Sequence, residues 1–422
     1  MQILMFGWEF PPRISGGLGT ACFGMTRALT GLGHEIVFVM PHCDEEAPSG
    51  FIELIAASRV PVLSADRKAP AAWKGLTLRA IHSSLRPYLN DRRYRALLSG
   101  PSGSRLFNIT GDYGADLISE SVRYGKAAGV IARERRFDII HAHDWMTVFA
   151  GIEARAVSGR PLILHIHSLE FDRSGEHIHQ DIYDIERHGM EAADRVIAVS
   201  HYTRRTIVER YGVNPAKISV VHNAVIKDDA LPDGRLRKDS ERKIVLFLGR
   251  ITLQKGPDYF IEAAARVLKE MPEVTFVMAG DGDMMPQMVE RVAELAIGDN
   301  FYFTGFLTRA EVERIYAISD LYVMPSVSEP FGITPLEAMR CDVPVIISRQ
   351  SGVSEILHHV LKVDFWDVSE MADKMIAVLR RPVLAADMVA RSREELRQIH
   401  WEGAAAKIET IYRSLIPPSP ET

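Results

Sequence analysis

The sequence has little cysteine and no long apolar run. Three cysteines, Cys22, Cys43 and Cys341, are too few and too far apart for a disulfide framework or a four-cysteine zinc site. No stretch approaches the roughly 18 apolar residues that a membrane-spanning helix needs. The first residues lack the basic region and the small-residue cleavage site of a signal peptide. We therefore expect a reduced, cytoplasmic protein without a membrane span.

An excess of charge of one sign is also lacking. Fifty-five acidic residues stand against fifty basic ones, with a formal net charge of −5. The concentrated basic footprint of a nucleic-acid-binding protein is therefore absent, and we expect no nucleic-acid partner. With 422 residues, 47% of them hydrophobic and 25% charged, the chain is large enough for two or three well-packed domains. This composition is typical of a large globular enzyme.

Short apolar runs alternate with longer segments of helical periodicity along the chain. In the first half, strands are predicted at Ile3–Gly7, Glu35–Met40, Phe137–His141, Leu162–Ile166 and Arg195–Val199. In the second half, they are predicted at Lys243–Leu248, Val274–Ala279, Asn300–Phe303, Leu321–Met324 and Val343–Ile347. Continuous apolar strands separated by helices indicate parallel sheets that helices cover on both faces. We thus predict an α/β protein with two doubly wound domains.

The polar stretch Lys227–Arg242 separates these halves and is predicted to be a linker. It divides the chain into an N-terminal domain, residues 1–226, and a C-terminal domain, residues 243–397. Ligands of such domains bind beyond the carboxyl ends of the strands, so two facing domains would form a cleft. The arginine-rich segment Leu85–Asp116 has two interpretations, a mobile loop with solvated charges or a contact to an acceptor or a membrane surface.

Glycines and basic residues follow several predicted strands. Gly16 and Gly17 lie in the loop after the first strand, where glycine allows close backbone approach and the following helix directs N–H groups at an anion. In the second half, Arg250 and Lys255 place two cations at a predicted helix start, which suits a phosphate or diphosphate. Gly280 ends the next strand with the same freedom of approach. Each feature alone is also compatible with an ordinary turn.

Histidines occur in pairs two positions apart, at His141 and His143, at His165 and His167, and at His177 and His179. Residues two apart on a strand share a face, and clustered imidazoles with a nearby carboxylate ligate zinc or another transition metal. We find no ordered set of further ligands, so packed or hydrogen-bonded roles are expected for His141 and His165, and no metal site is predicted. His143, Asp144 and His167 lie at strand ends, which favours polar substrate recognition.

The most specific motif is the segment Pro325–Met339. It carries Glu329 in a loop after a strand and Glu337 within the following helix, so two carboxylates project into one crevice from different heights. The amides of Ile333 and Thr334 lie at the helix start and form another anion cradle. The segment around Glu337 is apolar, which disfavours a surface position, because burying an unpaired carboxylate is costly.

In combination, these motifs resemble the retaining GT-B glycosyltransferases, especially family 4. The similarity covers almost the whole chain and rests on the order of the motifs, which are the Gly-Gly-rich first loop, Gly249-Arg250 with Lys255, Gly280-Asp281-Gly282, and Glu329 with Glu337. The segment His141–Trp145 also resembles bacterial and archaeal glycogen and starch synthases. Two departures favour family 4 over glycogen synthase proper, because Ile14 replaces a lysine and Phe331 replaces a cysteine of those synthases.

The resemblance implies a GT-B fold, in which two Rossmann-like domains face a central cleft and the second holds a nucleotide sugar. Arg250 and Lys255 would neutralise the departing diphosphate, while Glu337 would bind the ribose and Glu329 the donor sugar. The remaining implied contacts are Gly17, Gly280, Ile333 and Thr334 near the phosphates, Leu307 near the base, and His167 and Asp144 near the sugar and acceptor. A C-terminal helix, residues 398–416, would return to the first domain.

The resulting functional hypothesis is a retaining transfer of a hexose, glucose in the first place, from a UDP-, ADP- or GDP-linked donor. The acceptor would be a carbohydrate or other hydroxyl compound such as an α-glucan, and no cofactor is expected. Two alternatives stay open. One is a metal-dependent hydrolase that uses the His-x-His strand ends, and the other is a non-catalytic protein that binds nucleotide sugars.

Overall fold

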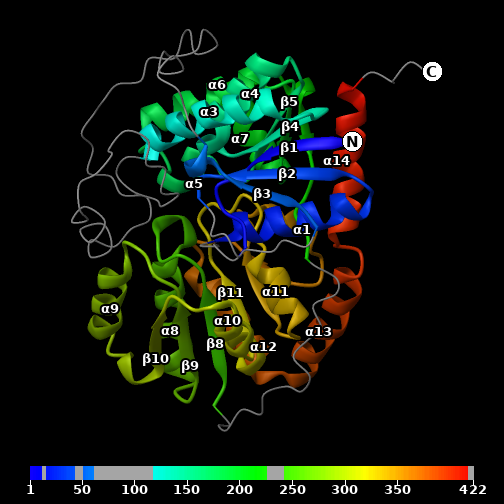
Figure 1. The fold of residues 1–422 in the computed structure, drawn as a ribbon. Helices are drawn as coiled ribbons and strands as arrows, with labels where there is room; N and C mark the ends of the chain where they lie inside the picture. The colour runs from blue at the N-terminus through cyan, green and yellow to red at the C-terminus, as the bar shows by residue number, and fades with distance from the viewer. Residues whose placement is uncertain (12–15, 43–50, 61–116, 226–241, 417–422) are drawn as a thin grey trace.

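The computed structural model describes residues 1–11, 16–42, 51–60, 117–225 and 242–416. The segment Leu85–Asp116, Ile14 and the predicted linker up to residue 241 lie outside the described residues. The described chain forms two halves, and each half is a parallel β-sheet with helices on both faces (Figure 1). The predicted class, an α/β protein with two doubly wound domains, is confirmed.

The first sheet contains, within the described residues, seven parallel strands in the order β3-β2-β1-β4-β5-β6-β7. These strands are β1 (Gln2–Phe6), β2 (Glu35–Met40), β3 (Glu53–Ala56), β4 (Ile139–His143), β5 (Leu162–Ile166), β6 (Arg195–Ala198) and β7 (Ile218–Val220). Five of them match predicted strands to within two residues at each end. The edge strands β3 and β7 were missed because they are short and only partly buried, without a continuous apolar run.

Two groups of helices cover this sheet. One face packs against α3 (Leu117–Glu134), α4 (Val148–Ser158), α6 (Gln180–Ala192) and α7 (His201–Tyr211), and the other against α1 (Gly17–Gly31) and α14 (Trp401–Leu415). Alternation along β1 explains the two layers, because Leu4 and Phe6 face the first group whereas Ile3 and Met5 face the second. The C-terminal helix α14 therefore packs beside α1, in the first half of the molecule (Figure 1).

The second sheet contains six parallel strands among the described residues, in the order β10-β9-β8-β11-β12-β13. They are β8 (Ile244–Leu248), β9 (Thr275–Ala279), β10 (Phe301–Gly305), β11 (Leu321–Met324), β12 (Val345–Ser348) and β13 (Leu361–Val363). One face packs against α8 (Pro257–Glu270), α9 (Met285–Glu294) and α12 (Val368–Arg380), and the other against α10 (Arg309–Ile318) and α11 (Thr334–Arg340). Helix α13 (Pro382–Leu396) then leads to α14.

Both sheets reverse their strand order beside their first strand, between β1 and β4 and between β8 and β11. The loops on either side of such a reversal diverge and leave a crevice at the carboxyl ends of the strands. The fold thus places one crevice in each half. No helix in the described part of the chain has the length and apolar character to cross a membrane.

Candidate active site

A cleft of about 1700 Å³ receives side chains from both halves of the molecule. Its walls come from segments that follow β1, β4 and β5 in the first sheet and β8, β9, β10 and β11 in the second. All the predicted site residues line this cleft: Gly17, Asp144, His167, Arg250, Lys255, Gly280, Leu307, Glu329, Ile333, Thr334 and Glu337. The two crevices therefore combine into a single candidate site.

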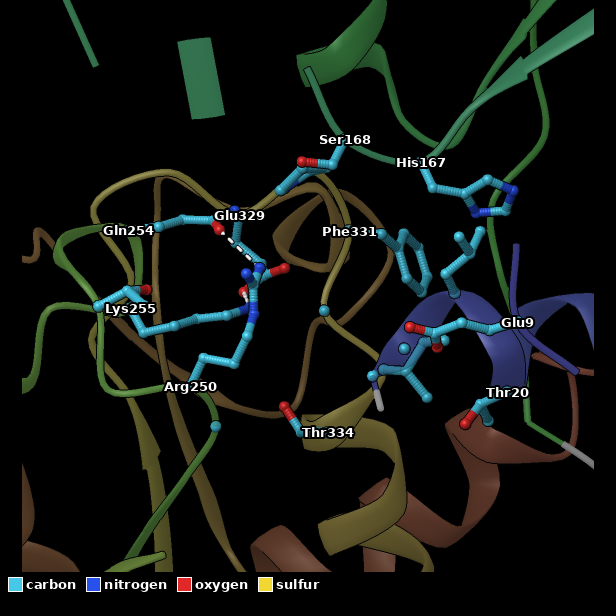
Figure 2. Close-up of a pocket in the computed structure, with 18 of the residues that line it drawn as sticks. Glu9, Thr20, His167, Ser168, Arg250, Gln254, Lys255, Glu329, Phe331 and Thr334 are labelled. Atoms are coloured by element: carbon cyan, nitrogen blue, oxygen red, sulfur yellow. Dashed lines mark hydrogen bonds and ion pairs between the residues drawn. The ribbon is translucent and has the colours of Figure 1, made fainter. Parts of the chain in front are cut away.

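Two basic side chains lie on the second-half wall of the cleft. Arg250 follows β8, and its Nη2 donates to Gln254 Oε1 at 3.1 Å. Lys255 ends a short 3₁₀ helix, Leu253–Lys255, and its Nζ lies 2.5 Å from Glu329 Oε2. Figure 2 shows Arg250, Lys255 and Glu329 converging on one region, with His167 on the other side of the cleft beyond Phe331. This charge arrangement suits an anionic ligand that carries hydroxyl groups.

Close backbone packing explains the glycine at position 280. Gly280 has a φ of +133°, and a Cβ atom there would lie 1.9 Å from the carbonyl oxygen of Gly249. Any other residue would therefore separate the ends of β8 and β9. Gly256 has a φ of +63°, and a Cβ there would lie 2.3 Å from the carbonyl oxygen of Pro325. These contacts hold the cation-bearing loop against the loop that carries Glu329.

Helix α11 presents its N-terminal turn to the cleft. Its first residue, Thr334, accepts a hydrogen bond from Tyr322 Oη at 2.8 Å through Oγ1. Glu337 lies within the helix and accepts from Tyr316 Oη at 3.4 Å. Burial raises the pKa of Glu337, while the nearby Arg340 opposes the rise. The first turn of a helix also directs unpaired backbone N–H groups outward, which adds donors for an anion.

The loop at Gly17 faces this helix from the other half. A Cβ atom at Gly17 would lie 4.0 Å from Ile333 Cδ1, the residue that precedes α11. The N-terminus of α1, which begins at Gly17, and the N-terminus of α11 therefore approach each other across the cleft. A small residue at position 17 leaves room for a ligand between these two helix ends.

Asp144 has a structural task as well as a place in the cleft wall. It is 5% exposed, and its backbone has a φ of +58°, a strained conformation for a residue with a side chain. Asp144 Oδ1 accepts hydrogen bonds from the backbone nitrogens of His167 at 2.6 Å and Ser168 at 3.3 Å. Burial raises the pKa of Asp144 to about 7. The carboxyl group thus ties the end of β4 to the end of β5 and orients the backbone of His167.

Four histidines form a compact group that we term the imidazole block: His141 and His143 on β4, His165 on β5 and His167 just beyond β5. His141 Nε2 lies 3.2 Å from His165 Nδ1, and His143 Nδ1 lies 3.0 Å from His167 Nε2. The rings of His141 and His143 stack with a centroid separation of 4.6 Å, and those of His165 and His167 stack at 4.4 Å. The packed, hydrogen-bonded roles expected for His141 and His165 agree with this arrangement.

Burial keeps the imidazole block uncharged. It lowers the pKa of His141 and His167 to about 3, and it lowers the pKa of His143 and His165 well below the ordinary value. At neutral pH each ring therefore carries a single proton. At the end remote from the cleft, His141 Nδ1 lies 2.5 Å from Tyr412 Oη on α14.

The metal hypothesis rested on the same histidines. His141, His143 and His165 each place a ring nitrogen within 4.8 Å of the other two, a spacing compatible with metal ligands. Contacts between the rings account for this proximity, since His141 Nε2 lies 3.2 Å from His165 Nδ1 and the ring of His143 stacks on that of His141 with centroids 4.6 Å apart. His177 and His179 also line the cleft but lie outside this cluster of the described residues.

A second buried network was missed by the sequence analysis. Glu186 of α6 is fully buried and accepts hydrogen bonds from Arg173 Nη2 at 2.6 Å, from the backbone nitrogen of Glu170 at 3.0 Å and from the hydroxyl of Tyr211. Burial raises the pKa of Glu186 to about 7. Arg173 also donates to the carbonyl oxygen of Ser168 at 3.2 Å. The network therefore holds the segment that follows His167.

A sequence signal for Glu186 did exist. It falls on the apolar stripe of its helix, together with Ile182, Ile185 and Gly189, at the spacing of one buried helical face. A carboxylate in such a stripe requires a partner. The partners themselves could not be read from the sequence, because Arg173 and Tyr211 lie on other elements.

Direct hydrogen bonds join the two halves beside the cleft. Ser328, next to Glu329, donates through Oγ to Asp172 Oδ1 at 2.6 Å and lies 3.0 Å from Tyr202 Oη. Glu355 of the second half accepts from the backbone nitrogens of His201 at 2.9 Å and Tyr202 at 2.6 Å, at the start of α7. The loop that carries Glu329 is thus positioned from both halves.

Comparison with known proteins places this architecture among the glycosyltransferases. Residues 232–395 match the family of group 1 glycosyl transferases, and residues 113–228 match glycosyltransferase family 4. An alpha-maltose-1-phosphate synthase from Mycolicibacterium smegmatis is 30% identical over 308 residues, which cover 66% of this chain and 79% of that protein. An uncharacterized glycosyltransferase from Methanocaldococcus jannaschii is 28% identical over 372 residues, which cover 85% and 83%. A glycogen synthase from Mycobacterium tuberculosis is 26% identical and covers 98% and 94%.

Solved structures share the fold over nearly the full chain. Sucrose-phosphate synthase from Thermosynechococcus elongatus superposes with a TM-score of 0.72 at 20% identity, covering 98% of each chain. The Anabaena HepE protein in complex with UDP-glucose superposes with a TM-score of 0.67 at 16% identity, covering 98% of this chain and 100% of HepE. These likenesses confirm the predicted arrangement of two Rossmann-like domains around a cleft.

Proposed function

Since the chain belongs to the group 1 and family 4 glycosyltransferases, we propose that it transfers glucose from a nucleoside diphosphate glucose to a carbohydrate hydroxyl, with retention of anomeric configuration. The observation that carries this proposal is that Arg250, Lys255, Glu329 and Glu337 all line one cleft. Two fixed cations suit a diphosphate, and two separated carboxylates suit two sets of hydroxyl groups.

In the proposed complex, the second half binds the donor. Arg250 and Lys255 bind the diphosphate and stabilise the negative charge that grows as the sugar leaves. Glu329, held by Lys255 at 2.5 Å and by Ser326 Oγ at 3.2 Å, accepts hydrogen bonds from the hydroxyls of the sugar. Glu337 binds the ribose hydroxyls. The backbones of Ile333, Thr334, Gly280 and Gly17 line the phosphates, and Leu307 lies near the base.

The first half contributes the side of the cleft at which the acceptor arrives. His167 and Asp144 lie at adjacent strand ends, and we assign His167 to contact with the sugar. The acceptor hydroxyl attacks the anomeric carbon on the face from which the diphosphate departs, and its proton passes to the departing phosphate oxygen. The bond to phosphate breaks as the new glycosidic bond forms, so no enzyme nucleophile, metal or cofactor is required.

The identity of donor and acceptor is supported by the relatives. The HepE structure is described as a complex with UDP-glucose, and two curated relatives are named as synthases of glycogen and of alpha-maltose-1-phosphate. UDP-glucose carries glucose, and glycogen and maltose are both built of glucose units. We therefore propose a glucosyl donor and an acceptor of the α-glucan or small-sugar class.

A donor screen tests the proposal directly. The full chain is mixed with UDP-, ADP- or GDP-glucose, and thermal stability and acceptor-dependent nucleotide release are measured with glycogen, maltose and glucose 1-phosphate. We expect one donor to raise the melting temperature and to release nucleotide when an acceptor is present. If none of the three donors stabilises the chain, the assignment of the donor site is wrong.

The same assay separates the two alternatives. A non-catalytic binder would be stabilised by the donor without releasing nucleotide, so Glu329→Gln would cause no loss of turnover. A metal-dependent hydrolase would release sugar to water in proportion to added zinc. Product analysis by proton NMR reports the anomeric configuration, and an inverted product would contradict the retaining mechanism.

A further inference from the structure

The imidazole block defines which ring nitrogen of His167 carries its proton. We propose that His143 is a positioning residue that holds His167 with the proton on Nδ1, so that His167 meets the substrate as a neutral hydrogen-bond donor. The inference deepens the proposed function and rests on it for the ligand in the cleft. The tautomer itself is a property of the protein without ligand.

The number of protons in the imidazole block is fixed, because its four rings are neutral. Each neutral imidazole has one N–H donor and one nitrogen acceptor. The four rings carry four protons, and hydrogen bonds join them in two pairs, His141 with His165 and His143 with His167. Within the described residues, His165 Nε2 and His143 Nε2 are buried without a hydrogen-bond partner. The direction of each pair therefore decides whether these two atoms are donors or acceptors.

Tyr412 sets the direction of the deeper pair. Its hydroxyl is buried, and burial raises the pKa of Tyr412, so the phenol keeps its proton. The structure gives that hydroxyl one partner among the described residues, His141 Nδ1 at 2.5 Å. The hydroxyl therefore donates to Nδ1, which places the His141 proton on Nε2. That nitrogen in turn donates to His165 Nδ1, and His165 carries its own proton on Nε2.

The outer pair then has one favourable direction. The rings of His143 and His165 are neighbours, with centroids 5.4 Å apart. If His143 Nε2 also carried a proton, two unpaired donors would be buried on adjacent rings, which is unfavourable. With the His143 proton on Nδ1 instead, Nε2 of His143 holds a lone pair. Of these two rings, only His165 then has a buried N–H without a partner among the described residues. His143 Nδ1 then donates to His167 Nε2 at 3.0 Å.

His167 consequently keeps its proton on Nδ1, the nitrogen that His143 does not engage. Stacking on His165 at 4.4 Å and the backbone bond from His167 to Asp144 fix the ring and its attachment. The ring lines the cleft opposite Arg250 and Lys255 (Figure 2). An N–H at this place suits an oxygen of the donor sugar. A proton on Nδ1 leaves His167 without a lone pair on the cleft side, so His167 cannot take the proton of the attacking hydroxyl. This agrees with the proposed transfer of that proton to the departing phosphate.

The tautomer can be measured without substrate. The full chain is labelled with ¹⁵N-histidine, and long-range proton–nitrogen spectra distinguish a ring nitrogen that carries a proton from one that does not. Comparison with the His167→Asn spectrum identifies the His167 signals. We expect a single tautomer with the proton on Nδ1. A proton on Nε2 of His167 would overturn the inference whatever the enzyme assay shows.

Two matched substitutions test the positioning role. Asparagine at position 143 places an amide N–H near the position of Nδ1, whereas leucine removes the donor. We expect His143→Leu to reduce kcat about tenfold with a smaller change in the KM for the donor, and His143→Asn to restore most of the loss. The His167 spectrum of the leucine variant should show mixed tautomers, and that of the asparagine variant should resemble the wild type.

These outcomes distinguish a failure of the positioning role of His143 from a failure of the proposed function. Equal activity of the leucine and asparagine variants, with an unchanged His167 spectrum in both, contradicts a positioning role for His143. Absence of turnover in the wild type with every donor contradicts the proposed function, while the tautomer measurement still decides the inference. If the leucine variant does not fold, the wild-type spectrum and the asparagine variant remain decisive.

Discussion

The two halves of the molecule build their cleft walls on the same strand order but handle charge in opposite ways. The second half places Arg250 and Lys255 at strand and turn ends, where their charges face the cleft. The first half neutralises its polar groups. Its four stacked histidines are uncharged, and its buried Glu186 is paired with Arg173. The side of the cleft with Arg250 and Lys255 therefore suits an anion, whereas His167 offers an uncharged ring to the hydroxyl groups of a sugar.

This difference shows how one topology serves two chemistries. A reversal of strand order leaves a crevice in each sheet whatever side chains line it. The charge on the wall then determines the ligand, because fixed cations stabilise a developing negative charge whereas buried neutral groups only orient a ligand. Four substitutions test the comparison, and they are described from the largest expected effect to the smallest.

The charged wall should be sensitive to loss of a cation. Lys255→Ala removes a charge proposed to stabilise the diphosphate and leaves Glu329, which is 6% exposed, without its 2.5 Å partner. We expect turnover to fall by about 10²–10³-fold, the effect typical of losing one stabilising group of a transition state. Nucleotide release at saturating donor measures this loss. The exposed Lys269→Ala on α8 should behave like the wild type, and unchanged turnover in Lys255→Ala would refute the role.

The buried polar network of the first half should matter mainly for stability. Glu186→Ala removes the acceptor for Arg173, Tyr211 and the Glu170 backbone, and it leaves buried donors unsatisfied. We expect the free energy of unfolding to fall by about 3 kcal/mol, as for other broken buried pairs. Urea denaturation measures this change. The exposed Glu191→Ala on the same helix should stay within about 0.5 kcal/mol of the wild type. A loss equal to that control would show that the network does not stabilise the fold.

The buried histidines should make the first half sensitive to acid. The folded pKa of His141 is lowered to about 3, whereas an unfolded histidine titrates near 6.5. Between these values the unfolded state binds a proton that the folded state does not, so stability falls as the pH decreases, by about 1.4 kcal/mol per pH unit for each such group. The raised pKa values of Asp144 and Glu186, each about 7, act in the opposite direction between pH 7 and 4.

A single substitution isolates the contribution of His141. The slope of unfolding free energy against pH between pH 6 and 4 is compared for the wild type and His141→Asn. We expect the slope of the variant to be smaller by up to about 1.4 kcal/mol per pH unit, which corresponds to one proton, since the variant lacks one group that protonates on unfolding. Comparison of slopes removes any pH-independent effect of the substitution. Identical slopes would mean that His141 is protonated in the folded state.

The smallest effect is expected at the far end of the imidazole block. Tyr412→Phe removes the hydroxyl that donates to His141 Nδ1 and leaves the ring of the side chain in place. We expect a loss of about 1 kcal/mol of stability, typical of one hydrogen bond, and a fall in turnover smaller than that of His143→Leu, because the direction of the hydrogen bonds in the imidazole block then has one determinant fewer. Thermal denaturation and the nucleotide-release assay measure the two quantities. Turnover and a His167 spectrum equal to those of the wild type would mean that Tyr412 does not set the direction of the hydrogen bonds in the imidazole block.

Much of the fold and of the cation-bearing wall could be predicted from the sequence. The buried strands are continuous apolar runs, and Arg250, Lys255 and Glu329 lie in the segments that connect a strand to the next helix, so local patterns locate them. The edge strands β3, β7 and β13 were missed because they are short and bury too little apolar surface to show such a run. The histidines of the first half could be named from the sequence, but their partners could not, and Glu186 was missed. Nothing in the sequence near Glu186 indicates Arg173, and nothing near His141 indicates Tyr412, 271 positions away.

The sequence by itself determined where strands and helices form and which chemical groups stand at the strand ends, because periodicity and strand-end chemistry are local properties of the chain. Tertiary structure alone decided how those groups are charged and oriented. The pKa of His167, the paired state of Glu329 and the direction of the hydrogen bonds in the imidazole block depend on burial and on partners from distant segments. Desolvation and hydrogen bonding act through space, so they exist only after the chain has folded.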